Sequence, residues 1–341
     1  MSMTRATFKE LIATNDFTRH RHPLITRIEE LLDGAKLITY TASPYHPLSS
    51  ILIQDIPMFE DLLRSIEPTD NGVLMINSPG GDGDVAEKML MMCRRRFPAS
   101  FRVIVPDYAK SAATMIALGS DEILMGYLSE LGPIDPQFRT AAYEPGTSAR
   151  SLIDGLELIR NKVAGGDPIQ LYYPLLSQIR PEMIARAESA INGAREYAEK
   201  WLKQYQLKHD QKQAESVSQW LSEGKTYKSH GKVIDVSECK NVLKLNVTEI
   251  DKHSELWDKV WELYCREVFF LMQNQGQGAA KLFENEKASL VLNVAIQVAL
   301  PQRQQPQRPP PSPTGPAGRP APPQENPPDE GKTERTFHEH A

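Results

Sequence analysis

Two turns in the sequence carry groups that could perform nucleophilic chemistry. In the first, at the end of an apolar run, residues 76–81 read INSPGG. The adjacent Gly80 and Gly81 can adopt backbone angles closed to other residues and present bare N–H groups to a ligand. In the second, Ser111 lies between the apolar run 101–105 and a predicted helix rich in small residues. Bare amides suit a developing oxyanion, and a serine at a helix N-terminus suits an activated nucleophile.

Each turn also has a purely structural interpretation. A Ser-Pro-Gly-Gly sequence is most often a loop, and a serine that opens a helix is most often an N-cap. The joint occurrence of both turns, with strands and helices in the right order between them, favours a catalytic site over two unrelated loops.

The two turns resemble a known superfamily. Residues 77–81 (NSPGG), a helix, a strand and then a small-residue elbow at Ser111 are similar to the Clp protease and signal peptide peptidase A superfamily. Within it, the chain resembles the serine dehydrogenase proteinase family over residues 24–250, most densely over 73–137. The resemblance implies an α/β fold, a ClpP/crotonase-like spiral of ββα units with added C-terminal helices. It also implies a homo-oligomeric serine endopeptidase acting on peptide or protein substrates.

The dehydrogenase part of that family name finds no support in the sequence. No GxGxxG fingerprint follows the first predicted strand, and the run from Gly80 to Gly83 does not fit one. We therefore expect no cofactor.

The histidines argue against a triad of the Clp type. His46 and His209 bracket a stretch without histidine. In the Clp branch the base follows the elbow by one strand and one loop, which here falls near Asp135. An aspartate has an unperturbed pKa of about 3.9, so Asp135 would be a weak base at neutral pH.

Lysine is the other known base, and elimination selects Lys162. It is the one lysine between Ser111 and Lys200, in a predicted helix at 149–163. Signal peptide peptidases of the superfamily use a Ser-Lys dyad, so the resemblance agrees. A lysine base must be neutral, which requires burial or positive neighbours to lower its pKa from about 10.4. An exposed lysine favoured by the helix dipole is the competing interpretation.

Other groups complete the predicted site. The amides of Gly80 or Gly81 and of Ala112 would form the oxyanion hole. Ser129 could orient the lysine amine as an auxiliary residue, or could simply cap its loop. Lys110 adjoins the serine, but neighbouring side chains on a turn generally point apart.

Two further features are given structural roles. Asp82 or Asp84 is read as a helix N-cap, because the remaining ligands of a calcium loop are missing, so no metal is expected. His230 lies in segment 225–232, which resembles a His-containing stretch of the family. Nothing in the sequence brings it to Ser111, although a fold could.

Composition sets the wider limits. The 341 residues carry a net charge of −5 and 40% hydrophobic residues, which allows a large core and gives no bias toward nucleic acid. Three cysteines without CxxC spacing predict a reducing, cytoplasmic location. Residues 1–16 lack the apolar core of a secretory signal, and no stretch is long enough for a membrane span.

Apolar periodicity predicts alternating strands and helices, and hence a parallel sheet. The expected strands are 36–41, 73–76, 101–105 and 122–125, and the expected helices are 25–32, 56–66, 84–96, 111–118, 149–163, 181–206, 213–224, 236–243 and 256–272. The expected domains are an N-terminal segment 1–23, a peptidase domain 24–250, a helical segment 251–300 and a disordered proline-rich tail 301–341. The tail could dock on an unknown partner through a polyproline helix.

Two other function classes stay open. The chain could be a peptide-binding or scaffold module that has lost efficient hydrolysis, and an exposed Lys162 far from Ser111 would favour that. It could also be a crotonase-like acyl-CoA enzyme, although that chemistry needs no hydroxyl at the elbow.

Overall fold

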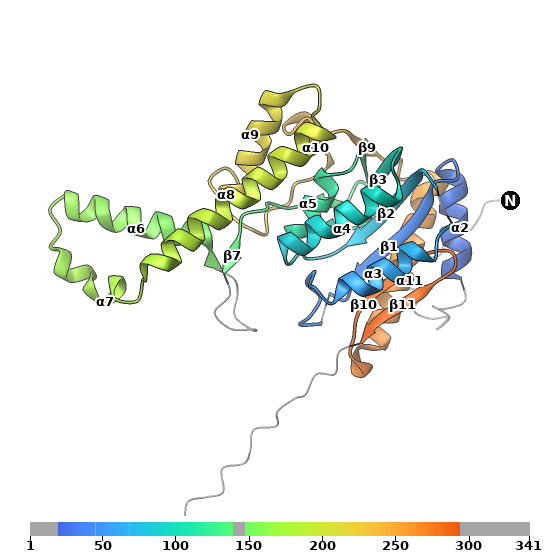
Figure 1. Cartoon of the computed structure of the whole chain (residues 1–341), viewed down its shortest axis with the longest axis horizontal. Coiled ribbons are helices and arrows are strands. Elements are labelled where there is room, and N and C mark those ends of the chain that lie inside the picture. Colours follow the sequence, from blue (N-terminus) through green and yellow to red (C-terminus); the bar gives the residue numbers. More distant parts are fainter. Residues whose placement is uncertain (1–19, 45, 68, 139–146, 294–341) are drawn as a thin grey trace, which may run out of the picture. The chain divides into compact units, whose positions relative to one another are not determined.

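The computed structural model describes residues 20–44, 46–67, 69–138 and 147–293 (Figure 1). Within these residues, the central sheet has the strand order β11-β10-β1-β2-β3-β5-β9. Its strands are β1 (Lys36–Ala42), β2 (Asn71–Asn77), β3 (Ser100–Val105), β5 (Glu122–Met125), β9 (Val247–Glu249), β10 (Ala279–Glu284) and β11 (Ser289–Asn293). β1, β2, β3, β5 and β9 are parallel, whereas β10 and β11 extend the β1 edge antiparallel.

Helices cover both faces of this sheet. The helical elements are α2 (Arg21–Leu31), α3 (Asp55–Arg64), α4 (Gly83–Arg96), α5 (Ala112–Leu118), α6 (Ala149–Ala164), η1 (Ile169–Tyr172), α7 (Tyr173–Leu176), α8 (Pro181–Gln204), α9 (Gln211–Ser222), α10 (Val236–Asn241), α11 (Glu255–Gln273) and η2 (Gln275–Gln277). The parallel strands alternating with α3, α4 and α5 confirm the predicted α/β class.

Alternation along the strands produces two cores. Val73 and Ile104 point to the face covered by α2 and α11, while Leu74 and Val103 point to the face covered by α3, α4 and α5. Because successive strand residues face opposite sides, both sets are buried. This burial explains why the parallel strands read as continuous apolar runs in the sequence.

Two small sheets lie outside the central one. β4 (Tyr108–Ala109) pairs parallel with β6 (Glu130–Leu131), and β7 (Gln137–Phe138) pairs antiparallel with β8 (Thr147–Ser148). The first pair connects the elbow region to the segment after β5. The second pair leads into α6, which packs on α8 (Figure 1).

The C-terminal segment differs from the expectation. Residues 251–300 were expected to be helical, and α11 does form there, but residues 279–284 and 289–293 form β10 and β11. β10 pairs with β1, so this segment completes the central sheet and does not stand apart from the domain expected at 24–250. The expected disordered tail 301–341 and most of the N-terminal segment 1–23 lie outside the described residues.

Among the described helices, none combines the length and the apolar character that crossing a membrane would require.

Candidate active site

The glycine turn and the serine elbow lie against each other. Ser78 N donates to Tyr108 O at 3.1 Å, and Lys110 N donates to Ser78 O at 3.0 Å. Gly80, with φ of 95°, packs so tightly that a Cβ there would lie 2.5 Å from Lys110 O and 2.6 Å from Ser111 Cβ. The close contact between the two turns therefore requires glycine at position 80, because glycine has no side chain and tolerates a positive φ.

Ser111 has an unusual backbone conformation. Its φ is 50° and its ψ is −118°, outside the regions that residues with a side chain normally occupy. It stands at the N-cap position of α5, yet its side chain makes no capping hydrogen bond. The helix-cap interpretation of this serine is thus not what the geometry shows, and the half-buried hydroxyl is left available for chemistry.

Two amides beside Ser111 are free to bind an oxyanion. Ile51 N donates to Gly80 O at 2.7 Å and Asp82 N donates to Ile51 O at 2.9 Å, so these bonds bracket Gly81. Successive residues of an extended strand direct their N–H groups to opposite sides, which turns the Gly81 amide away from Ile51. Within the described residues, neither this amide nor that of Ala112, in the first turn of α5, donates a hydrogen bond.

Lys162 lies apart from this arrangement. It is in the last turn of α6, its side chain is exposed, and it makes no ion pair or hydrogen bond to another described side chain. The burial that a lysine base requires is therefore missing at this position. The structure does not bring Lys162 to Ser111.

The other lysine and serine candidates are engaged in the scaffold. Lys110 Nζ pairs with Glu130 Oε1 at 2.8 Å and donates to the carbonyl oxygens of Leu131 and Lys232. Ser129 is buried, where its Oγ donates to the backbone and accepts from Gly126 N at 2.8 Å. Ser129 therefore caps its loop, the structural alternative considered for it.

A histidine–aspartate pair joins two segments that contact the elbow region, and sequence reasoning did not assign it. His230 Nδ1 is 2.7 Å from Asp135 Oδ1, and Gln137 Nε2 donates to Asp135 Oδ2 at 2.7 Å. The Asp135 side chain is 4% exposed, whereas that of His230 is 31% exposed. When Nδ1 carries the proton and donates to Asp135, Nε2 is left unprotonated and can act as a base.

Several contacts hold both partners of this pair near the elbow. Thr114, one turn into α5 from Ser111, donates through Oγ1 to Gly132 O at 3.0 Å, three residues before Asp135. On the other side, Ile234 forms an antiparallel bridge with Leu131. Together with the Lys110 bond to Lys232 O, these contacts fix segments 131–135 and 230–234 around the start of α5.

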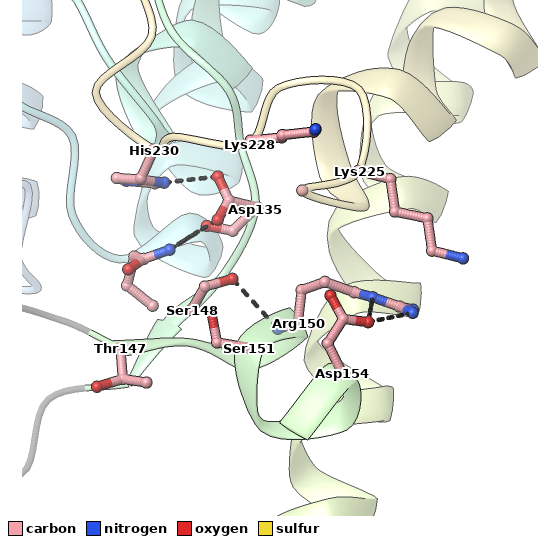
Figure 2. A pocket seen from close by; sticks show the side chains of 11 residues that line it. Asp135, Thr147, Ser148, Arg150, Ser151, Asp154, Lys225, Lys228 and His230 are labelled. Carbon is pink, nitrogen blue, oxygen red and sulfur yellow. Dashed lines mark hydrogen bonds and ion pairs between the residues drawn. The ribbon is translucent and has the colours of Figure 1, made fainter. Parts of the chain in front are cut away.

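The pair also forms one wall of a cavity of about 690 Å³. Figure 2 shows His230 and Asp135 next to Lys228, with Arg150 and Lys225 farther across the cavity. Arg150 is paired with Asp154, while the two lysines are exposed and make no ion pair within the described residues. Cationic groups therefore flank the candidate base.

The acidic residues after the glycine turn have a helical role. Asp82 Oδ1 accepts from the amides of Asp84 at 2.9 Å and Val85 at 3.2 Å, which confirms Asp82 as the N-cap of α4. Among the described residues, no group of three or more His, Cys, Asp or Glu side chains is gathered in a way that could hold a metal ion.

A family model with the description ClpP-like SDH-type serine proteinase matches residues 48–273, more than half of the chain. The chain belongs to this family. This confirms the predicted resemblance and, with the sheet topology, the predicted fold. The match includes the glycine turn, the elbow, Lys162 and the His230–Asp135 pair.

Two uncharacterized proteins of Methanocaldococcus jannaschii, MJ0137 and MJ1495, are similar to this ClpP-like SDH-type chain. Both are 31% identical, the first over 58% of this chain and 64% of its own length, the second over 40% and 45%. The chain thus spans less than two thirds of each of these relatives.

Two solved structures are also similar to the chain. The 1510-N membrane-bound stomatin-specific protease is 14% identical, with a TM-score of 0.37 over 72% of this chain and 88% of that one. ClpP1 from Listeria monocytogenes is 16% identical, with a TM-score of 0.32 over 66% and 96%.

Proposed function

We propose that this chain is a serine endopeptidase that hydrolyses peptide bonds through an acyl-enzyme on Ser111. The observation that carries the proposal is the strained Ser111 elbow, with an uncapped hydroxyl, next to the unbonded amides of Gly81 and Ala112. Membership of a serine proteinase family supports the same activity.

The proposed reaction uses groups already in place. Ser111 Oγ attacks the scissile carbonyl carbon, and the oxygen of that carbonyl, as it becomes negative, accepts from the amides of Gly81 and Ala112. Each such donor is worth roughly 3 to 4 kcal/mol in serine proteases. The proton from Ser111 passes to a base and then to the leaving amine, and water hydrolyses the acyl-enzyme in the second half-reaction.

We propose His230, oriented by Asp135, as that base. The buried carboxylate of Asp135 sets the imidazole tautomer and stabilises the imidazolium that forms during attack. The Ser111–Lys162 dyad remains the competing assignment. It would require Lys162 to leave its exposed position on α6 or to act on a second copy of the chain.

The substrate class, the oligomeric state and the cellular location are also proposals, and none of them is tied to particular residues. A peptide or protein substrate follows from the proposed chemistry, and a homo-oligomer is the expectation taken from the family resemblance. The cytoplasmic location predicted from cysteine usage stays a prediction, as does the absence of nucleic-acid binding.

A fluorophosphonate probe tests the nucleophile and the base together. We expect the probe to label Ser111 in the full-length chain, as mapped by mass spectrometry, and Ser111→Ala to abolish the label. His230→Ala should slow labelling by about 100-fold or more, the usual contribution of a general base, while Lys162→Ala should not. The reverse ranking of these two variants would establish the Ser-Lys dyad.

A peptide-binding module is the second candidate function. Two observations favour it. Lys162 is exposed and lies apart from Ser111, and the Ser111 hydroxyl makes no hydrogen bond to a base among the described residues. Catalytic hydrogen bonds are often long before substrate binds, so this geometry does not exclude hydrolysis. Folded wild-type protein that never labels at Ser111, yet binds peptides, would establish the binding role in place of the peptidase.

A further inference from the structure

A fully buried ion pair joins the start of α3 to β10. Lys281 Nζ lies 2.7 and 2.8 Å from the two carboxylate oxygens of Asp55, and both side chains are 0% exposed. Tyr40 OH donates to Asp55 Oδ2 at 2.8 Å. The free-energy cost of removing two charges from water is about as large as the free energy gained from their attraction. A buried ion pair is therefore weak evidence for a purely stabilising role.

Asp55 makes one further contact, which leads toward the candidate active site. Its Oδ2 accepts from Leu52 N at 3.0 Å, and its own amide donates to Leu52 O at 2.9 Å. These two bonds close the turn that leads into α3. Leu52 directly follows Ile51, whose backbone brackets Gly81.

The contact between Ile51 and Gly81 leaves no room for adjustment. A Cβ on Gly81 would lie 2.4 Å from both the N and the O atom of Ile51. Any shift of the Ile51 backbone would therefore be passed to the Gly81 peptide, and so to the direction of its N–H group. A displacement of this kind weakens a donor that has to meet the oxyanion in a fixed geometry.

We propose that Asp55, held by Lys281, is a positioning residue for the oxyanion hole: its carboxylate anchors the Leu52 amide, and the Ile51 backbone then holds the Gly81 N–H toward Ser111. This inference rests on the proposed function of the site.

A pair of double variants separates positioning from simple stabilisation. Asp55→Asn with Lys281→Met and Asp55→Leu with Lys281→Met both remove the two buried charges. The amide oxygen of asparagine can still accept from Leu52 N, whereas leucine cannot. An effect that depends only on the ion pair would be the same in both variants.

We expect the variants to differ in the rate at which the fluorophosphonate probe labels Ser111. The leucine variant should label about 100-fold more slowly than wild type and the asparagine variant within about threefold of it, since loss of one oxyanion donor costs 10²–10³. Amide hydrogen exchange, followed by NMR, should quicken at Ile51 and Asp82 in the leucine variant alone. If that variant does not fold, Asp55→Ala with Lys281→Met serves the same comparison without overpacking.

Equal labelling rates in the two double variants, together with equal exchange at Ile51 and Asp82, would overturn the positioning role. If the probe does not label Ser111 in folded wild-type protein, that result would instead contradict the proposed peptidase function. In that case the exchange measurement still decides whether Asp55 holds the Ile51–Gly81 contact.

Discussion

At the scale of single residues, strain is concentrated at the candidate nucleophile. Ser111 has φ of 50° and ψ of −118°, and such conformations cost about 1–3 kcal/mol each for a residue with a side chain. Gly80 packs against it, and the α5 backbone continues directly from it. The surrounding structure therefore holds the serine in a conformation that an ordinary helix cap would not need.

This strain predicts opposite effects of one substitution on activity and on stability. Ser111→Gly and Ser111→Ala should both abolish probe labelling, because both remove the hydroxyl. Glycine tolerates positive φ, so Ser111→Gly should exceed Ser111→Ala in free energy of unfolding by about 1 kcal/mol, measured by urea denaturation. A glycine variant less stable than the alanine variant would show that Ser111 is not strained.

The His230–Asp135 pair gives a second prediction at this scale. Asp135→Asn should lower kcat by roughly 10⁴-fold with little change in thermal stability, by analogy with the aspartate of serine protease triads. The matched control is Gln137→Met, which removes one hydrogen bond to the same carboxylate and should cost about tenfold. Peptide hydrolysis with a fluorogenic substrate measures both, and similar losses in the two variants would contradict the orienting role of Asp135.

The sequence predicted one half of this site and not the other. The glycine turn and Ser111 each end a local strand pattern, so neighbouring residues were enough to locate them. His230 and Asp135 are 95 positions apart and meet through the Leu131–Ile234 bridge, which no local pattern encodes. From the sequence, His230 receives only a structural role, because nothing local brings it to Ser111.

At the scale of elements, burial of charge explains why β10 was not predicted from the sequence. The parallel strands β1, β2, β3 and β5 are mostly apolar and were predicted, with boundaries within a few residues, whereas the short parallel strand β9 was not predicted. β10 contains Lys281 and Glu284, which are both completely buried and form ion pairs with Asp55 and Arg21. Because these charged residues interrupt the apolar pattern, the sequence of β10 does not resemble a buried strand. Charges that are neutralised by distant partners break the apolar pattern without leaving the core.

The same region contains a buried carboxyl group whose protonation should affect stability. Glu267 of α11 accepts from Thr41 Oγ1 of β1 at 2.5 Å, near Glu284 of β10 and Arg21 of α2. Burial, followed by the charge of Glu284, raises the pKa of Glu267 to about 8. The folded chain therefore keeps a proton on Glu267 at pH values where the unfolded chain, with a pKa near 4.5, has released it.

We expect this carboxyl group to make the protein less stable as pH rises. Between the unfolded and folded pKa values the folded state binds more protons, so the free energy of unfolding falls with increasing pH. Glu267→Gln should flatten that decline, as measured by thermal unfolding between about pH 5.5 and about pH 8. A variant whose decline is as steep as that of wild type would assign the pH dependence to other groups.

At the scale of the whole molecule, apolar surface is gathered on one helical region. In the region formed by α6, η1 and α7, Ala149 alone is buried, and Leu158, Leu171 and Leu175 are 60%, 67% and 56% exposed. Monomeric proteins rarely expose clustered apolar side chains of this kind. Such clusters usually mark a surface that binds another protein. The homo-oligomer expected from the family resemblance would cover them.

We expect this region to mediate self-association. Leu171→Asp combined with Leu175→Asp places two charges where a second copy would have to remove water, so the molar mass measured by light scattering should fall toward that of one chain. Val242→Asp is the matched control, because Val242 is 49% exposed on the surface just after α10 and should leave the mass unchanged. An equal loss of mass in both variants, or none in either, would show that assembly does not depend on the α6–α7 region. If the mass falls and Ser111 labelling falls with it, assembly is needed for the active site, and Lys162 on α6 becomes a candidate contribution from the second copy.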